Sequence, residues 1–178
     1  MNDFDNSHVP DQKREQIEHM LSEADEPDEQ TYAFLCLGAL WEKREDWLSA
    51  IDNYTKALAA GSRRTDFLYY GNNNLGYSLI QLGRFFDAEG FCLAALEVDP
   101  ARHNAHKNLG LVRQGQERWQ EAAFCFIKAY SLCPNDKRAW HLLMALLRLH
   151  PYLLAQSENL RVNIAELEQF SEDTPLPN

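Results

Sequence analysis

The small and hydrophobic residues of the chain repeat at a fixed interval. The positions that recur are Leu75-Gly76, Ala88, Ala95 and Pro100, which return as Leu109-Gly110, Ala122, Ala129 and Pro134. Self-similarity with a period of about 34 residues is typical of stacked helical hairpins. Glycine inside an apolar helix costs about 1 kcal/mol relative to alanine, so its recurrence indicates close helix packing. The pattern therefore predicts an all-α solenoid of antiparallel helix hairpins.

The repeated residues resemble the tetratricopeptide repeat. The resemblance covers three full units, 31–64, 69–102 and 103–136, and a partial fourth unit, 137–151, in which Met144 replaces the glycine. It implies a right-handed superhelical stack with a concave groove. Solenoids of this kind are mostly binding surfaces, so the resemblance also implies a function in protein binding.

One break in the period separates the first two units. Gly38 and Gly76 lie further apart in the sequence than Gly76 and Gly110, and the difference is four extra residues, 65–68, between the units. Four residues make about one helical turn, so the next helix either begins one turn early, with the extra turn projecting beyond its neighbours, or follows an inserted loop. The run 71–74, Gly-Asn-Asn-Asn, should then weaken this helix by about 2 kcal/mol relative to alanines. Such a departure from local propensity often marks a functional surface.

The resemblance implies that the first helix of each hairpin lines the groove and presents particular positions to a ligand. In this sequence these positions are Tyr70, Asn73, Asn74, Tyr77, Gln81, Asn104, Lys107, Asn108, Leu111, Gln114, Arg138, His141 and Arg148. Asn74 and Asn108 are equivalent in successive units, and a side-chain amide can pair with both the C=O and the N–H of a peptide backbone. The two asparagines are either rungs of a short peptide-binding ladder or solvated side chains.

Three basic residues at groove positions, Lys107, Arg138 and Arg148, favour a peptide partner with acidic or C-terminal carboxylate groups. Some members of the family hold the C-terminal carboxylates of heat-shock chaperones in a clamp of five residues. This sequence matches two of those positions, with Asn108 and Arg138, and has Leu142 where the clamp has arginine. We therefore expect a protein or peptide partner, but not through this specific clamp.

Most of the net charge of −10 lies in residues 1–30, which contain ten acidic and two basic residues. This charge argues against nucleic acid or a membrane surface as a partner. We expect an acidic N-terminal arm with one short helix at 10–24, which either keeps the protein soluble or covers the groove until a partner displaces it. No apolar run approaches about 18 residues and no signal-peptide pattern occurs, so we expect a cytoplasmic protein.

Pro151 interrupts the repeat pattern near the C-terminus. Apolar residues at helical spacing then predict a capping helix over 152–171, followed by a tail, 172–178. A solenoid must cover its last apolar face, and this helix is suited to that role. Alternatively, the same helix pairs with a second copy of the chain to form a homodimer.

Motifs of catalytic chemistry are lacking. The sequence has no phosphate-binding loop, nucleophile elbow or metal-protease pattern. His103 and His106 have a spacing that can face one metal ion, but a structural role is the preferred interpretation. The four cysteines have no metal-binding spacing and are expected to be reduced thiols. We therefore predict no enzymatic activity, no catalytic residue, no cofactor and no metal site.

These observations predict a protein-interaction module, adaptor or chaperone-like, that holds an extended peptide or partner segment in its concave groove. The alternative is an assembly component that acts through its terminal helices. A secretion-type chaperone is a variant of the first hypothesis.

Overall fold

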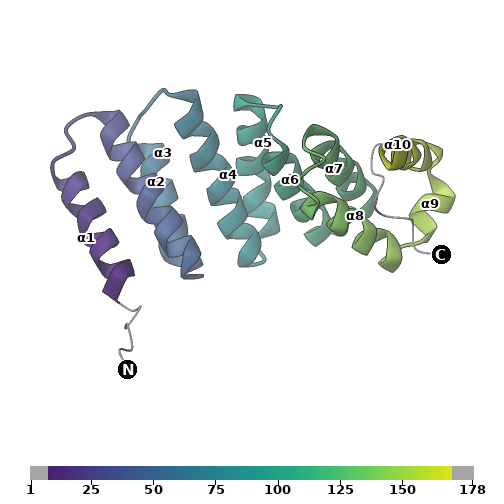
Figure 1. The fold of residues 1–178 in the computed structure, drawn as a ribbon, viewed down its shortest axis with the longest axis horizontal. Helices are drawn as coiled ribbons and strands as arrows, with labels where there is room; N and C mark the ends of the chain where they lie inside the picture. The colour runs from purple at the N-terminus through teal and green to yellow at the C-terminus, as the bar shows by residue number, and fades with distance from the viewer. Residues whose placement is uncertain (1–7, 170–178) are drawn as a thin grey trace.

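The computed structural model describes residues 8–169, with side-chain surroundings for residues 12–167. Figure 1 shows the helices standing side by side in one curved row. Their bounds are α1 (His8–Ser22), α2 (Pro27–Lys43), α3 (Trp47–Ala59), α4 (Thr65–Gln81), α5 (Phe85–Val98), α6 (His103–Gly115), α7 (Trp119–Leu132), α8 (Arg138–Leu149), α9 (Tyr152–Gln156) and α10 (Glu158–Gln169). The pairs α2–α3, α4–α5 and α6–α7 make the largest helix–helix contacts, and residues 8–169 contain no strand. The predicted all-α solenoid of helix hairpins is therefore confirmed.

The first hairpin begins at Pro27, four residues before the predicted start of the first unit at 31. Proline is favoured at the first position of a helix. Asp28 and Glu29 lie in the first turn, where the positive end of the helix dipole stabilises negative charge. The last residues of the predicted acidic arm are thus the first turn of α2.

α1 stands at the N-terminal end of the row, beside α2 (Figure 1). Ile17 of α1 is buried against Ala33 and Leu37 of α2. The helix expected at 10–24 therefore occupies His8–Ser22 and packs on the first hairpin.

The four extra residues between the first two units extend a helix. α4 begins at Thr65 and continues without a break to Gln81. Because α2 and α4 both have 17 residues, the added turn of α4 lies beside the early turn of α2 instead of projecting beyond its neighbours. At this level Tyr32 of α2 stacks on Phe67 of α4, with ring centroids 6.1 Å apart.

The Gly-Asn-Asn-Asn run does not interrupt α4, because its residues make specific contacts. A Cβ atom on Gly71 would lie 2.6 Å from Cδ2 of Leu58, so the glycine leaves room for α3 to approach α4. Asn72 donates from Nδ2 to the carbonyl of Leu68, one turn earlier, at 2.8 Å. Tertiary packing and side-chain hydrogen bonds thus override the low helix propensity of this segment.

The repeated glycines mark the closest approach of the two helices in a hairpin. A Cβ atom on Gly38 would lie 2.5 Å from Cε1 of Tyr54, and one on Gly110 would lie 2.5 Å from Cε1 of Phe126. Both rings are fully buried. The close packing that the sequence predicted from recurring glycine is therefore confirmed at these positions.

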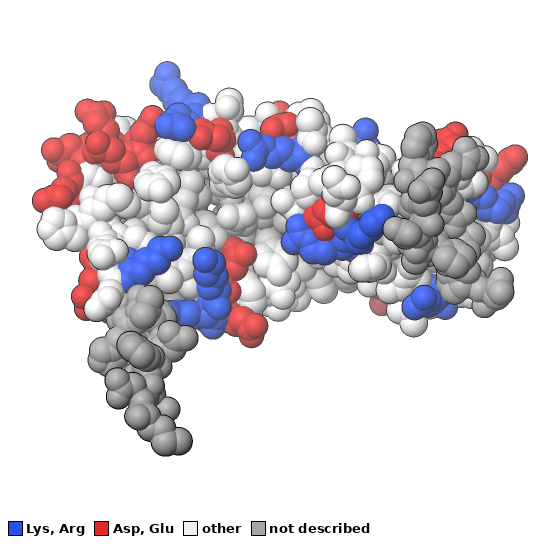
Figure 2. Space-filling view, viewed as in Figure 1, with Lys and Arg blue, Asp and Glu red and all other residues white. Residues whose placement is uncertain are grey.

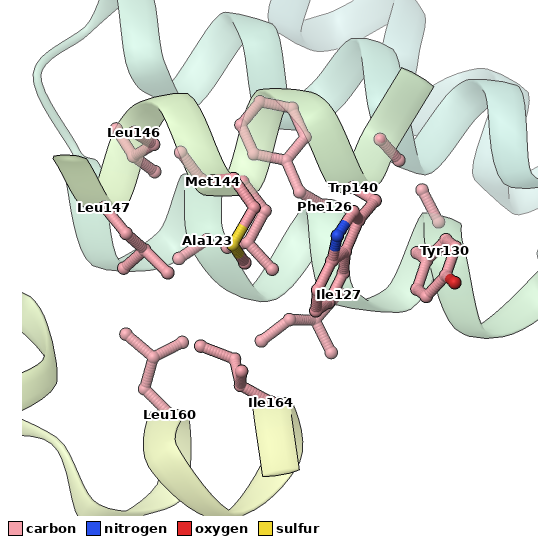
Figure 3. Packing of buried hydrophobic residues seen from close by; sticks show 14 of the residues in the cluster. Ala123, Phe126, Ile127, Tyr130, Trp140, Met144, Leu146, Leu147, Leu160 and Ile164 are labelled. Carbon is pink, nitrogen blue, oxygen red and sulfur yellow. The ribbon is translucent and has the colours of Figure 1, made fainter. Parts of the chain in front are cut away.

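α10 closes the C-terminal end of the solenoid. Figure 3 shows Leu160 and Ile164 of α10 packed against the core of α7 and α8, which contains Trp140. The single helix expected over 152–171 is instead divided into α9 and α10 at Ser157, whose hydroxyl accepts a hydrogen bond from the backbone N–H of Leu160 at 3.3 Å and caps the new helix. Leu160 and Ile164, two apolar residues of the helix considered for homodimer formation, are therefore buried within the chain. The predicted tail lies outside the described residues.

Candidate peptide-binding groove

Two adjoining pockets lie along the first helices of the hairpins. The polar pocket, of about 210 Å³, is lined by Glu42, Asn73, Asn74, Tyr77, Asn104, Lys107, Asn108 and Arg138. The apolar pocket, of about 660 Å³, is lined by Asp28, Glu29, Tyr32, Leu35, Cys36, Ala39, Arg64, Asp66, Phe67, Tyr70 and Asn74. Asn74 lines both pockets, so the two adjoin, and together their lining residues from α2, α4, α6 and α8 are called the groove below.

The floor of the polar pocket is a chain of hydrogen bonds between helices. Asn108 of α6 donates from Nδ2 to Oδ1 of Asn73 at 3.0 Å, and Asn73 donates from Nδ2 to Oδ1 of Asn74 at 2.9 Å. Asn74 in turn donates to the hydroxyl of Tyr54 at 3.4 Å, and Tyr54 donates to Oε2 of Glu42 at 2.8 Å. The asparagine amides expected to face a peptide thus already make bonds within the protein. The second-helix residue Tyr54 joins α3 to this network.

The polar pocket holds two opposite charges that are both partly removed from water. Lys107 is 8% exposed, and its Nζ donates to Oδ1 of Asn104 over a long 3.4 Å. Burial lowers the pKa of Lys107, while burial raises the pKa of Glu42. The attraction between the two charges opposes both shifts.

Arg138 adds a second cation at the edge of the polar pocket, but Asp136 neutralises it. Nη2 of Arg138 lies 2.6 Å from Oδ2 of Asp136, and this contact holds the pKa of the carboxyl group well below its usual range. Arg148, the third predicted base, is exposed on α8 and lines neither pocket. With Glu42 also present, the groove is less basic than the sequence suggested.

The apolar pocket is built from aromatic rings that remain accessible. Tyr32 is 50% exposed and Tyr70 is 43% exposed. The guanidinium of Arg64 lies over the ring of Phe67, 4.2 Å from its centroid, and pairs with Asp66 at 2.7 Å. The rings form the walls, while these charged groups lie where α4 begins.

The structure brings seven of the thirteen predicted groove residues together in the polar pocket: Asn73, Asn74, Tyr77, Asn104, Lys107, Asn108 and Arg138. Tyr70 lines the apolar pocket with Asn74. Neither pocket includes Gln81, Leu111, Gln114, His141 or Arg148. Leu111 packs against the hydrophobic core.

Sequence reasoning missed the contribution of α2, namely Tyr32 and Glu42. The signal was present for Tyr32, because Tyr32 and Tyr70 have the same separation along the chain as Gly38 and Gly76. Applying the groove positions to the first unit would have identified Tyr32.

The two histidines considered as a metal pair have different partners. Nε2 of His103 lies 3.0 Å from Oδ2 of Asp136, and Nε2 of His106 lies 2.9 Å from the carbonyl oxygen of Pro100. Within the described part of the chain, no group of three or more His, Cys, Asp or Glu side chains is placed to hold a metal ion. The four cysteines are unpaired thiols, and burial raises the pKa of Cys92 to about 12. Over the same residues, no helix combines the length and apolar character needed to span a membrane.

The sequence matches no protein-family model and no curated protein. The fold is similar to several solved structures. The TPR domain of Arabidopsis OM64 matches 68% of this chain and 97% of its own, with 26% identity and a TM-score of 0.61. MamA 41-end from Desulfovibrio magneticus RS-1 matches 94% of this chain and 90% of its own, with 19% identity and a TM-score of 0.69. The first TPR of Spaghetti (RPAP3) bound to the HSP90 peptide SRMEEVD matches 67% of this chain and 91% of its own, with 22% identity and a TM-score of 0.60. The chain therefore has the fold of a tetratricopeptide-repeat domain.

Proposed function

We propose that the chain is a non-enzymatic protein-interaction module, adaptor or chaperone-like, whose groove holds an extended peptide or partner segment. The polar pocket binds the peptide backbone together with an acidic or C-terminal carboxylate group. Support for a peptide ligand also comes from the similar fold of the Spaghetti domain, which binds an HSP90 peptide.

The observation that carries the proposal is unused hydrogen-bonding capacity in the polar pocket. Oδ1 of Asn108 is buried and has no hydrogen-bond partner within the described structure, which costs about 1–3 kcal/mol for such a group. Because the oxygen is closed to solvent, a backbone N–H of a bound peptide would satisfy it once the Asn108 side chain rotates towards the pocket that it lines.

Lys107 supplies the complementary charge for a carboxylate. An ammonium group has three donors, and the hydrogen bond that Nζ makes to Asn104 is long. A carboxylate that enters the polar pocket would pair with the ammonium group of Lys107. Glu42 and Asn104 compensate only part of its charge and hydrogen-bonding capacity. A bound anion would also offset the cost of burying Lys107.

The experiment is a selection of phage-displayed random 12-residue peptides on the immobilised full chain, followed by fluorescence anisotropy on the peptides obtained. Lys107→Met keeps the apolar stem of the side chain and removes the charge. We expect it to weaken the carboxylate-bearing peptides about tenfold, the value of a charge-assisted hydrogen bond.

The matched control is Arg148→Gln, which removes a cation outside both pockets and should leave the affinity unchanged. Circular dichroism checks that both variants stay helical. Equal loss in the two variants, no loss with Lys107→Met, or no enriched peptide would each contradict the proposal.

A further inference from the structure

We infer that the apolar pocket between α2 and α4 binds one bulky apolar side chain of the partner segment, preferably aromatic, that is flanked by a lysine or arginine. This inference rests on the proposed function and specifies the partner at a second position along the same groove. The two positions adjoin at Asn74, which lines both pockets.

The size and lining of the pocket determine the apolar part of this ligand. Its volume of about 660 Å³ exceeds that of the polar pocket threefold, and its walls are Leu35, Ala39 and three aromatic rings. Tyr32 and Tyr70 are each about half exposed, so they leave aromatic surface that an aromatic side chain can contact. Burying such a side chain removes apolar surface of both partners from water, which is the main source of affinity at the centre of an interface.

The charge at the rim determines the flanking residue. Three of the four charged residues that line the pocket are acidic, namely Asp28, Glu29 and Asp66. Arg64, the single base among them, is paired with Asp66, so Asp28 and Glu29 remain as net negative charge. Figure 2 shows further acidic side chains gathered at this end of the molecule, where α1 meets α2. A lysine or arginine next to the apolar anchor complements this rim.

The chain's own N-terminal segment is a poorer match for the pocket. Residues 1–7 contain one aromatic residue, Phe4, but Asp3 and Asp5 flank it. The acidic rim would repel these carboxylates. The charge therefore favours a separate partner segment as the occupant.

The experiment uses the peptides selected on the full chain. We expect the enriched sequences to contain a bulky apolar residue, most often aromatic, within two positions of a lysine or arginine. Ala39→Trp fills the pocket and should weaken these peptides by at least about tenfold. Tyr32→Ala removes a half-exposed side chain from the pocket wall and should disturb folding less than Ala39→Trp does. We expect it to weaken binding of these peptides about fivefold. Leu48→Ala, which removes an exposed apolar side chain of α3, is the matched control and should have no effect.

A charge reversal tests the rim separately. Glu29→Lys should weaken the basic-flanked peptides about threefold at low salt, with the difference shrinking at high salt because ions screen exposed charges. The same variant should bind glutamate-flanked versions of the peptides more tightly than the native chain does.

The outcomes distinguish this inference from the proposed function. One outcome would overturn the inference and leave the polar pocket as the binding site. In it, the peptides bind Ala39→Trp and Tyr32→Ala with the same affinity as the native chain, but bind Lys107→Met more weakly. Enriched peptides without an apolar–basic pair would overturn it as well. A selection that yields no binding peptide would overturn both proposals.

Discussion

The two pockets of the groove share Asn74 but differ in what their side chains do for the fold. In the polar pocket, the side chains form a hydrogen-bond chain that links α6 to α2 through buried Asn73 and Asn108. In the apolar pocket, Tyr32 and Tyr70 are half exposed and contribute less to the core. We therefore expect substitutions in the polar pocket to change stability together with the proposed binding, and substitutions in the apolar pocket to change mainly the proposed binding.

The largest expected effect comes from displacing Tyr54, which belongs to the hydrogen-bond chain of the polar pocket. Gly38→Ala would place a Cβ atom 2.5 Å from the ring of Tyr54, which is fully buried and bonded to Glu42. We expect the free energy of unfolding to fall by about 2–3 kcal/mol, because overpacking forces the ring out of position. Urea denaturation followed by circular dichroism measures the change.

The matched control is Gly90→Ala, at a helical glycine with nothing near its Cβ position. This variant should gain up to about 1 kcal/mol, because alanine is the better helix former. Equal losses of stability in Gly38→Ala and Gly90→Ala would contradict the prediction. They would show that position 38 does not require glycine because of the close approach of Tyr54.

The second prediction compares the pockets directly. Asn108→Ala removes the side chain that joins α6 to α4 and leaves Oδ1 of Asn73 without its donor, so we expect a loss of about 2 kcal/mol in unfolding free energy. Tyr32→Ala, in the apolar pocket, should cost less than about 1 kcal/mol because half of the side chain is already in water. Equal costs in the two variants would remove the distinction between the pockets.

The sequence predicted the architecture because packing imposes a strict period on small residues. Gly110 recurs one full period after Gly76 because each glycine faces a side chain of its hairpin partner, Phe126 or Cys92. The sequence allows two alternatives for residues 65–68, because a helical turn and a loop of four residues look alike in one sequence. The early start of α2 supplies the neighbour that the extended turn packs against.

The roles of the groove asparagines were harder to predict. Resemblance placed Asn108 in the groove, but its burial depends on Asn73, which lies on another helix. Glu42 was missed because its role depends on Tyr54, a second-helix residue that the repeat pattern assigns to packing. Contacts of this kind become visible only when the helices are placed side by side.

The third prediction tests whether Lys107, which we propose binds the peptide carboxylate, lowers the stability of the folded protein. Lys107→Met should raise the free energy of unfolding by about 1 kcal/mol, because the cost of burying this cation outweighs its attraction to Glu42, as the lowered pKa of Lys107 indicates. The same variant is expected to lose peptide affinity. A thermal or urea denaturation curve measures the change in the free energy of unfolding. A lower stability of Lys107→Met would show that the ammonium group stabilises the protein when no peptide is bound.

The smallest effect is a pH dependence from Glu42. Burial raises its pKa above the ordinary value of 4.5, so the folded protein holds this proton more tightly than the unfolded chain does. The resulting stabilisation is present at low pH and is lost as the pH rises through the raised pKa. The unfolding free energy of the native chain, relative to Glu42→Gln, should therefore increase as the pH falls from 7 towards 5. If this relative stability instead decreased as the pH falls from 7 towards 5, the pKa of Glu42 would be lowered in the folded protein and not raised.

The most direct test of the groove as a continuous binding site is a ¹H–¹⁵N NMR titration of the full chain with a selected peptide. The account predicts that the largest shift changes occur in residues of both pockets, with Asn74 at their junction, while Phe86 on the exposed face of α5 and Val162 on α10 stay unchanged. Changes centred on α5 or α10, with the signals of α4 and α6 unmoved, would contradict it.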